Sequence, residues 1–340
     1  MAGNGEINIQ NAQEAQLGIW KAAFIKSLAG AVVLPVNVVK TLMQLGYEPF
    51  PLEMGKRFIV VGHDAYFLPN GIKYMFKLAE KNGVAVLFRG FDCYIASNFI
   101  NEVAKKSLHE YIDLEYPTLG GVKKENSDDF TKLSTEEAVA VSFRNYVRDM
   151  FVSNTAMIIS RPLAVLFVRN VAQIIGGENK YTNLIGDIFK IGREEGLRGL
   201  FAGLAVSIVG TSLIVTVQHV VSFTIERGLL TLPPTEGETE DERITKIKKT
   251  YSLISNIIPF ISNSFSYPYM LISSIMAVTG SQLACSVMPY TPVFNHYEDY
   301  YGYLKPNGSI TRGSKLFLRE HPGAIQFSNG QIFVNNKYFS

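Results

Sequence analysis

Hydrophobic residues gather into five long segments of the chain, each long enough to cross a lipid bilayer. A helical crossing needs about 20 mostly apolar residues. The five segments run over about 17–45, 91–112, 139–175, 202–232 and 251–278. Every segment also contains charged or amide residues, so we predict membrane-spanning helices that share a polar interior. Long helices of a soluble protein are the competing interpretation.

Polar residues within these segments fall on one face of each predicted helix. Helix residues at i, i+3, i+4 and i+7 share a face. A charge at the bilayer centre costs about 2.5–3.5 kcal/mol, so one-sided placement indicates that these faces meet each other or water. Ordinary polar contacts between helices remain an alternative, above all for the Ser and Thr positions. The predicted lining residues are Lys26, Asn37, Lys40, Asn98, Asn101, Glu102, Lys105, Asn154, Arg161, Arg169, Thr211, Gln218, Asn256, Asn263 and Ser266.

The connections between these segments alternate in character. Amphipathic stretches at 70–81 and 183–195 predict short helices after the first and third spans. The segments at 120–132 and 233–243 have a composition typical of disorder. Ser134 and Glu137 form a capping-box pattern that predicts the start of the third span.

An internal repeat orders these elements. Pro35, Pro162 and Pro268 recur about a hundred residues apart, and each is predicted to bend its helix. The pattern x-G-x4-F-x-G occurs at 82–90 and again at 195–203, where glycine can end a short helix in left-handed geometry. We therefore divide the chain into a tail 1–16, a first repeat 17–113, a polar loop 114–133, a second repeat 134–230, a polar loop 231–249 and a degenerate third repeat 250–340.

Composition and charge narrow the function classes. Only 18% of residues are charged, and the formal net charge of +2 gives no reason to expect nucleic acid. Cys93 and Cys285 have no CxxC partner and are expected to be free thiols. Residues 1–16 contain two Glu and no Arg, which does not fit a signal peptide or a cleavable mitochondrial presequence.

Motifs for catalysis or cofactors are missing from the sequence. Residues 308–315 read GSITRGSK, in which Ser-Lys stands where a phosphate-binding loop has Lys-Ser or Lys-Thr. The histidines show no metal-ligand spacing; they are His63, His109, His219, His296 and His321. We expect neither an enzyme nor a bound metal or cofactor.

The proline and glycine pattern resembles the mitochondrial carrier family. Its signature is P-x-[DE]-x-x-[KR]-x-[KR], followed by [DE]-G-x4-[FWY]-[KR]-G, and it implies three helix pairs around a central path. In this chain Asn37, Ala164 and Met270 stand at the acidic positions. The basic positions keep only Lys40 and Arg169. A gate closed by ion pairs between the repeats is therefore not expected.

Further motifs resemble the mitochondrial carrier homolog family, a divergent outer-membrane branch of the carriers. The stretch QLGYEPFP at 44–51 is similar to the family's Q-x-G-[YH]-E-P-x-P. Similar matches cover 193–204, 267–278, 289–292 and 312–317, so the resemblance extends over nearly the whole chain. Where the homologs carry an acid in the fourth span, this chain has Thr211.

The last predicted repeat has no partner helix. Residues 309–340 contain Pro322, Gly323 and Gly330 and no apolar run of twenty residues. The predicted fold class is an all-α integral membrane protein with a degenerate mitochondrial-carrier fold that lacks its sixth transmembrane helix. A bundle missing one helix would expose its polar path to lipid as a groove.

The family resemblance implies an insertase for α-helical outer-membrane proteins, including tail-anchored ones. Expected partners are membrane lipids and these client proteins, and the expected location is the mitochondrial outer membrane. Phospholipid scrambling through the same groove is an alternative. Docking of a pro-apoptotic BH3 protein, implied by the resemblance, is another, and small-metabolite transport is disfavoured by the broken signature.

Overall fold

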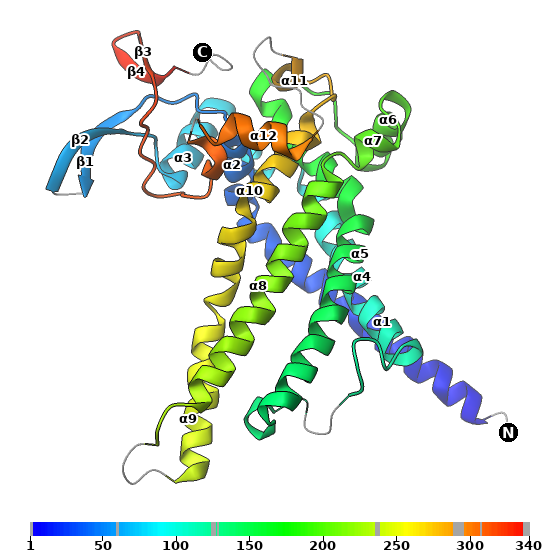
Figure 1. The fold of residues 1–340 in the computed structure, drawn as a ribbon. Helices are drawn as coiled ribbons and strands as arrows, with labels where there is room; N and C mark the ends of the chain where they lie inside the picture. Colours follow the sequence, from blue (N-terminus) through cyan, green and yellow to red (C-terminus); the bar gives the residue numbers. More distant parts are fainter. Residues whose placement is uncertain are drawn as a thin grey trace. The chain divides into compact units, whose positions relative to one another are not determined.

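The computed structural model describes residues 3–58, 61–123, 127, 129–234, 239–287, 296–306 and 308–335. The chain is mostly helical, with two short β-hairpins (Figure 1). It contains helices long and apolar enough to cross a membrane. The predicted fold class, an all-α integral membrane protein, is confirmed, whereas the division into three repeats stays a prediction.

Long helices occur at all five predicted spans. Their bounds are α1 Gly3–Gly30, η1 Ala31–Val33 and α2 Leu34–Leu45 for the first, α4 Phe91–Glu115 for the second, α5 Thr135–Gly176 for the third, α8 Leu204–Leu230 for the fourth, and α9 Glu240–Ser255 with α10 Ile258–Val278 for the fifth.

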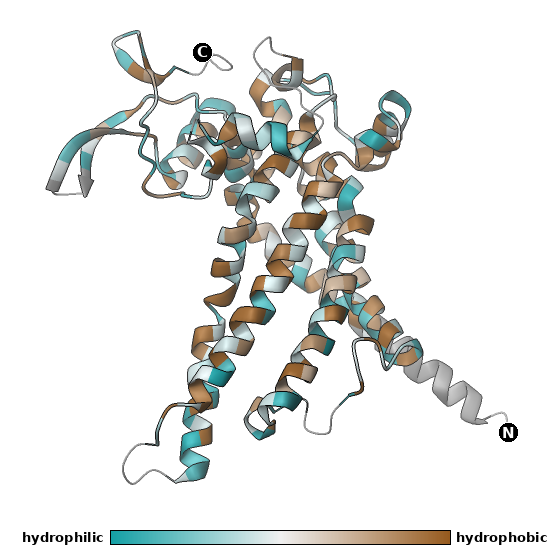
Figure 2. Cartoon of the chain, viewed as in Figure 1, coloured by the Kyte–Doolittle hydropathy of each residue, from teal (hydrophilic) through white to brown (hydrophobic). Residues whose placement is uncertain are grey.

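Three stretches of the described chain are both long and apolar enough to span a bilayer. They are Leu17–Leu45, Thr135–Gly176 and Leu197–Leu230. Helices α4 and α10 have 25 and 21 residues and therefore sufficient length. Their composition, however, is too polar for them to be among the three stretches that qualify as membrane spans. Figure 2 shows hydrophobic residues along the long helices, whereas α9 is mostly hydrophilic.

The three predicted prolines lie within these helices. Pro35 stands in the first turn of α2, directly after the 3-10 turn η1, where its missing N–H costs no helical hydrogen bond. Pro162 and Pro268 lie inside α5 and α10. The capping box at the start of α5 is also confirmed, because the Glu137 amide donates to Ser134 Oγ at 3.3 Å and the Ser134 amide to Glu137 Oε2 at 3.1 Å.

Both predicted amphipathic helices are present, as α3 (Gly71–Asn82) and α6 (Leu184–Glu194). Short turns follow them, η2 (Val84–Phe88) and α7 (Leu197–Leu200). Gly83 and Gly196 link each helix to its turn with φ of 84° and 68°, as the motif required. Their ψ values of 156° and −159° correct the prediction of left-handed helical geometry. The chain leaves each helix in an extended conformation that only glycine adopts easily.

Two features of the fold differ from what the sequence predicts. Part of the segment 233–243 is helical, because Thr239 and Glu242 form a capping box that starts α9. The hairpins β1 (Glu53–Phe58) with β2 (Val61–Phe67) and β3 (Ile325–Ser328) with β4 (Gln331–Val334) were not predicted. A short turn, η3 (Phe130–Lys132), precedes α5.

Every helix of the described residues that follow α10 is short. They are α11 (Ala284–Val287), α12 (Tyr297–Leu304) and η4 (Ser309–Thr311). The eight residues of α12 extend about 12 Å, well short of the roughly 30 Å of a bilayer core. The motif at 289–292 lies outside the described residues.

The chain divides into two compact units. Unit 1 comprises 1–100, 160–206 and 268–340, and unit 2 comprises 101–159 and 207–267. Unit 1 holds the larger core, in which α2, α3, the second half of α5 and α6 contribute buried side chains. Unit 2 has a small buried cluster of Leu133, Ala138 and Val141 against Phe223. Helices α4, α5, α8 and α10 run through both units.

Candidate functional site

The polar residues of the first span differ in their exposure within unit 1. Lys26 is exposed, whereas Asn37 and Lys40 are half-buried. Asn37 Nδ2 donates to the hydroxyl of Tyr94 on α4 at 2.9 Å. A polar contact between two neighbouring helices therefore accompanies the stripe that the sequence predicts.

Arg161 ties three segments of unit 1 together. Its Nε donates to the carbonyl of Ala202 at 3.0 Å, and Nη2 donates to Ser273 Oγ at 2.8 Å. A Cβ at Gly203 would come within 2.8 Å of the Arg161 Nη2 and of the Ser273 carbonyl. This close approach, together with a φ of 68°, explains why the second motif ends in glycine.

Arg169 forms a second buried centre in unit 1. Its side chain is fully buried and makes a two-pronged ion pair with Glu195, with 2.8 Å between Nη2 and Oε2. It also donates to the Ala277 carbonyl at 2.9 Å and to the Tyr181 hydroxyl at 3.2 Å. Gln173 accepts from the Tyr181 amide at 2.6 Å. Arg169 is the basic residue and Glu195 the acidic residue of the carrier signature that this repeat keeps, and the two pair with each other.

The polar stripe of unit 2 links α5 to α8. Asn154 Nδ2 donates to Ser212 Oγ at 3.0 Å, and the hydroxyls of Tyr146 and Thr216 are 3.2 Å apart. The side-chain amide oxygen of Asn154, Oδ1, is buried and has no hydrogen-bond partner among the described residues. An unsatisfied acceptor costs about 1–3 kcal/mol, so this oxygen is a favourable place for water or for a donor from a bound molecule.

A junction of three ionisable residues joins α4, α5 and α8 in unit 2. His219 Nε2 lies 2.9 Å from Asp149 Oδ2, and His109 Nε2 lies 3.4 Å from Asp149 Oδ1. Sequence spacing carried no metal or dyad signal for these histidines, because they are distant along the chain. One signal was available: Asp149 is one of few acids in an apolar span, and such a residue needs a partner.

Arg148 fixes the loop after α4. It pairs with Asp113 and donates to the carbonyls of Ile112, Leu119 and Tyr116 at 3.0–3.2 Å. Sequence analysis did not single out this residue, although a guanidinium with five donors suits a cluster of loop carbonyls.

The fifteen predicted lining residues are divided between the units. Lys26, Asn37, Lys40, Asn98, Arg161 and Arg169 belong to unit 1, and the other nine to unit 2. Half-buried members are Asn37, Lys40, Asn98, Asn101, Glu102, Lys105, Asn154, Thr211 and Gln218. Lys26, Asn256 and Asn263 are exposed, whereas Arg161, Arg169 and Ser266 are buried. The role of the accessible residues as a lining stays a prediction.

The motif at 44–51 meets the end of the chain in unit 1. Arg312 Nε donates to the Gln44 carbonyl at 2.7 Å. Arg319 pairs with Glu48 and donates to the Pro69 carbonyl at 2.8 Å. We call residues 312–321 the strap, because they run back along the segment that follows the first span.

The described residues contain no group of three or more His, Cys, Asp and Glu side chains placed to hold a metal ion. Cys93 and Cys285 are free thiols, as predicted. Burial raises the pKa of Cys285 to about 12, so this thiol is uncharged at neutral pH.

Comparison with known proteins identifies the family. No family model matches the chain. Mitochondrial carrier homolog 2 of Mus musculus is 30% identical over 292 residues, covering 85% of this chain and 89% of the relative. The protein of the same name from Homo sapiens is 29% identical over the same shares. Mitochondrial carrier homolog 1 of Mus musculus is 26% identical over 327 residues, covering 92% of this chain and 79% of that protein. Together with the apolar helices, these matches indicate a mitochondrial membrane protein, and the chain belongs to the mitochondrial carrier homolog family.

Proposed function

We propose that the protein inserts α-helical proteins, tail-anchored proteins among them, into the mitochondrial outer membrane. An inserting helix is itself apolar, but its polar flank must pass through the hydrocarbon core. Each polar group without a partner there costs several kcal/mol, of the order of that for burying an unpaired amide. A protein lowers this barrier when it offers polar partners along the path and leaves one side open to lipid.

The observation that carries the proposal lies in unit 2. Helices α5 and α8 belong to stretches apolar enough to cross a bilayer, yet Thr211 and Gln218 are only half-buried. On α10, Asn263 is exposed. Such accessible polar groups on membrane-length helices suit a passing polar segment better than they suit permanent helix packing.

The buried residues do not take part in this proposal. Arg161 and Arg169 are saturated by contacts within unit 1, and Ser266 is buried. Within unit 2, the proposed lining therefore keeps the accessible members of the predicted set. Within unit 1, the leading candidate is Lys40, because this half-buried lysine stands at the basic position of the carrier signature.

The test is insertion of a tail-anchored client by purified protein in liposomes. We expect Lys40→Glu and Asn263→Leu each to slow insertion about 5- to 150-fold, the equivalent of about 1–3 kcal/mol for one lost polar partner. Lys40→Arg keeps the charge and serves as the control for the first variant. Ser264→Leu, a neighbouring exposed position on α10, is the control for the second.

The proposal is wrong if Lys40→Glu and Asn263→Leu both insert the client as fast as their controls. The same liposomes, loaded with fluorescent phospholipid, also test the alternative function. Variants that stop lipid flipping but leave client insertion unchanged would identify a scramblase instead.

A further inference from the structure

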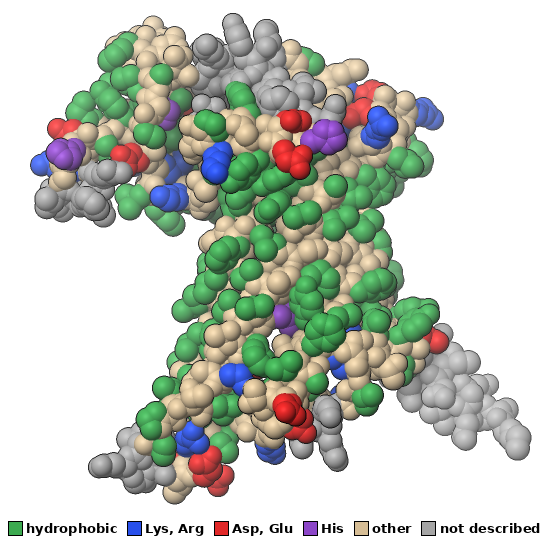
Figure 3. Space-filling view, viewed as in Figure 1, with side chains coloured by type: hydrophobic (Ala, Val, Ile, Leu, Met, Phe, Trp, Pro, Cys, Tyr) green, Lys and Arg blue, Asp and Glu red, His purple; other side chains and the backbone are tan. Residues whose placement is uncertain are grey.

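Three stretches of unit 2 contain no acidic, basic or histidine side chain. They are 150–159 of α5, 207–218 of α8 and 258–267 of α10, and we call them the neutral stretches. Helices α5 and α8 belong to stretches apolar enough to cross a bilayer, and α10 is long enough. Figure 3 shows, on one face, that acidic and basic side chains lie toward the ends of the long helices, with hydrophobic or uncharged side chains between them.

The neutral stretches nevertheless carry polar side chains that stay accessible. Thr211 and Gln218 of α8 are half-buried, and their spacing of seven residues places them on one face of the helix. Asn263 of α10 is exposed. Side-chain amides and hydroxyls each offer both hydrogen-bond donors and acceptors, and they carry no charge. The accessible groups of the neutral stretches can therefore serve a donor or an acceptor, but they provide no counter-ion.

At one end, ionic residues border the neutral stretches of α5 and α8 and are engaged by the protein. Asp149 directly precedes the stretch of α5 and His219 directly follows the stretch of α8, with 2.9 Å between Oδ2 and Nε2. Arg148 donates to loop carbonyls at 3.0–3.2 Å. Further along α8, Arg227 donates to the Phe130 carbonyl at 2.7 Å. These charges join helices and loops at the border of a zone that has no charge of its own.

Helix α4 brings charges to the predicted lining of unit 2, but no net charge. Its charged lining residues are Glu102 and Lys105, and both are half-buried. They stand three residues apart, where side chains of opposite charge meet on one helix face. The charges of the predicted lining in this unit therefore cancel.

A polar flank loses its water when it enters the hydrocarbon core. An uncharged amide or hydroxyl recovers hydrogen bonds from the amides and hydroxyls of a protein. A charged side chain has a far larger hydration energy, which neutral dipoles replace only in part. A neutral polar lining therefore lowers the barrier more for an uncharged flank than for a charged one, and it does so for both signs of charge.

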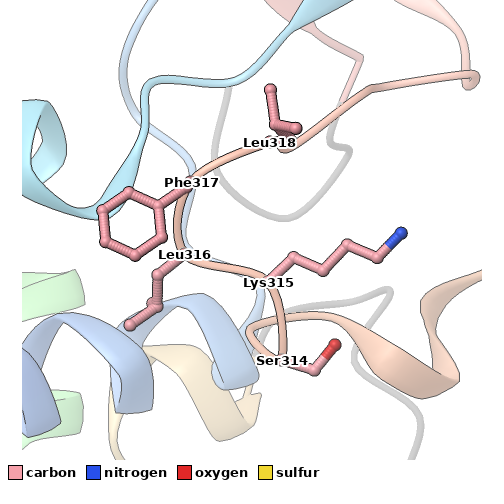
Figure 4. A pocket seen from close by; sticks show the side chains of 5 residues that line it. All are labelled: Ser314, Lys315, Leu316, Phe317 and Leu318. Atoms are coloured by element: carbon pink, nitrogen blue, oxygen red, sulfur yellow. The ribbon is translucent and has the colours of Figure 1, made fainter. Parts of the chain in front are cut away.

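The open hollow on the strap suits an uncharged polar flank less well. Residues 314–318 line this hollow of about 460 Å³ in unit 1. Figure 4 shows its polar side chains, one hydroxyl from Ser314 and one ammonium from Lys315, beside three apolar side chains. A flank that needs several uncharged partners finds a single one here, so the neutral stretches are the better place for it.

We propose that the neutral stretches select clients whose translocated flank is polar but uncharged, rich in Ser, Thr, Asn and Gln, over clients with acidic or basic flanks. This selection rests on the insertase function proposed above. A lining with a fixed net charge would favour flanks of the opposite sign, whereas the neutral stretches disfavour both signs. Lys40 adds a cation in unit 1, so an acidic flank should be slowed less than a basic one.

The test compares three tail-anchored clients that share one transmembrane helix and differ in the flank at the translocated end. One flank contains only Ser and Asn, and in the others two of these residues are replaced by Asp or by Lys. The measured quantity is the acceleration, which is the insertion rate into liposomes with the purified protein divided by the rate into protein-free liposomes. We expect the acceleration of the uncharged client to exceed that of each charged client about tenfold or more.

Variants at Asn263 place a charge of either sign within the neutral stretch of α10. We expect Asn263→Asp to raise the acceleration of the basic client about threefold or more, and Asn263→Lys to do the same for the acidic client. Ser264→Asp and Ser264→Lys put the same charges at the adjacent exposed position, which lies outside the predicted lining, and serve as matched controls. The controls should change the acceleration of every client by less than about twofold.

The outcomes separate the selection from the insertase function. Equal acceleration of the three clients, or greater acceleration of a charged one, overturns the selection and leaves the insertase function standing. No acceleration of any client overturns the insertase function and the selection with it. Charges at Asn263 that change no client, or that act no differently from those at Ser264, overturn the assignment of the selection to the stretch of α10.

Discussion

The pair of Glu48 and Arg319 offers the sharpest test of how unit 1 is held together. Both side chains are largely buried, and Arg319 joins the strap to the loop that follows the first span. Its second hydrogen bond goes to the Pro69 carbonyl at 2.8 Å. The other carboxylate oxygen of Glu48, Oε2, is buried without a partner among the described residues. Arg319 is therefore the main compensation for a buried negative charge.

The perturbation is Arg319→Met, which keeps most of the apolar stem and removes the charge. Removing one partner of a buried ion pair costs about 3–5 kcal/mol, because the other charge stays behind in a poorly solvating site. The lost hydrogen bond to Pro69 adds about 1 kcal/mol. Since the pair joins segments 271 residues apart, we expect the strap to open locally before the helices unfold.

The stability that Arg319→Met loses should depend on pH. Burial raises the pKa of the Glu48 carboxyl, and the charge of Arg319 opposes this rise. Without Arg319 the pKa rises further. The folded state then binds a proton more readily than the unfolded state, so the variant is most stable below the unfolded pKa and loses stability as pH rises through the folded one. The variant should be less stable at pH 7 than at pH 5.

Hydrogen exchange of two backbone amides measures the local opening of the strap. The Leu68 amide donates to the Arg319 carbonyl and the His321 amide to the Tyr66 carbonyl, each at 2.8 Å. At pH 7 we expect their protection, corrected for the intrinsic rate, to fall by about three to four orders of magnitude in Arg319→Met. Glu48→Gln combined with Arg319→Met should restore much of it, because no charge is left buried. Wild-type protection in the single variant would refute the reasoning.

Two further predictions concern other ion pairs. Arg169→Lys keeps the charge but loses the two-pronged contact with Glu195, and it should lower the free energy of unfolding by about 1–3 kcal/mol in thermal denaturation, with Arg193→Lys, an exposed position, as the control. Lys248 holds the pKa of Asp129 down to about 2, so the contact between α9 and the loop before α5 persists above the usual carboxyl pKa and is lost as pH falls toward 2. Relative to its cleavage of an unstructured reference peptide at the same pH, pepsin should cut that loop faster at pH 2 than at pH 4. Lys248→Ala should remove most of this difference, and an unchanged corrected pH profile in that variant would contradict the assignment.

Local sequence patterns were sufficient to predict the helices but not the hairpins. The sequence predicted α3, α6 and the start of α5, because periodicity and caps act within a few residues. The hairpin of β1 and β2 is a two-stranded ribbon, which is marginal by itself. Its support comes from the strap, where the His321 amide donates to Tyr66, about 250 residues away in sequence. No local pattern encodes that contact.

The candidate site was predictable in the same uneven way. Helical spacing placed polar residues on one face of each span, and Asn154 does meet Ser212 on the facing helix. The junction of His109, Asp149 and His219 was missed because its three helices come together only in the fold. Spacing also could not tell that Arg169 is enclosed by its partners, because burial depends on packing.

The residues that carry the family resemblance mostly hold the architecture of unit 1. Gln44 and Arg312 lie in two separate motifs and bond to each other. Arg169 meets Glu195 of another motif. These contacts join helix ends to the segments that follow them, and none leaves a charge open to a passing molecule. The motifs therefore identify the fold. In the proposed insertase, the selectivity of the lining would instead rest on residues such as Thr211 and Asn263, which stay accessible and lie outside these contacts. Under that proposal, exchanging them should change which client helices are inserted while the fold remains intact.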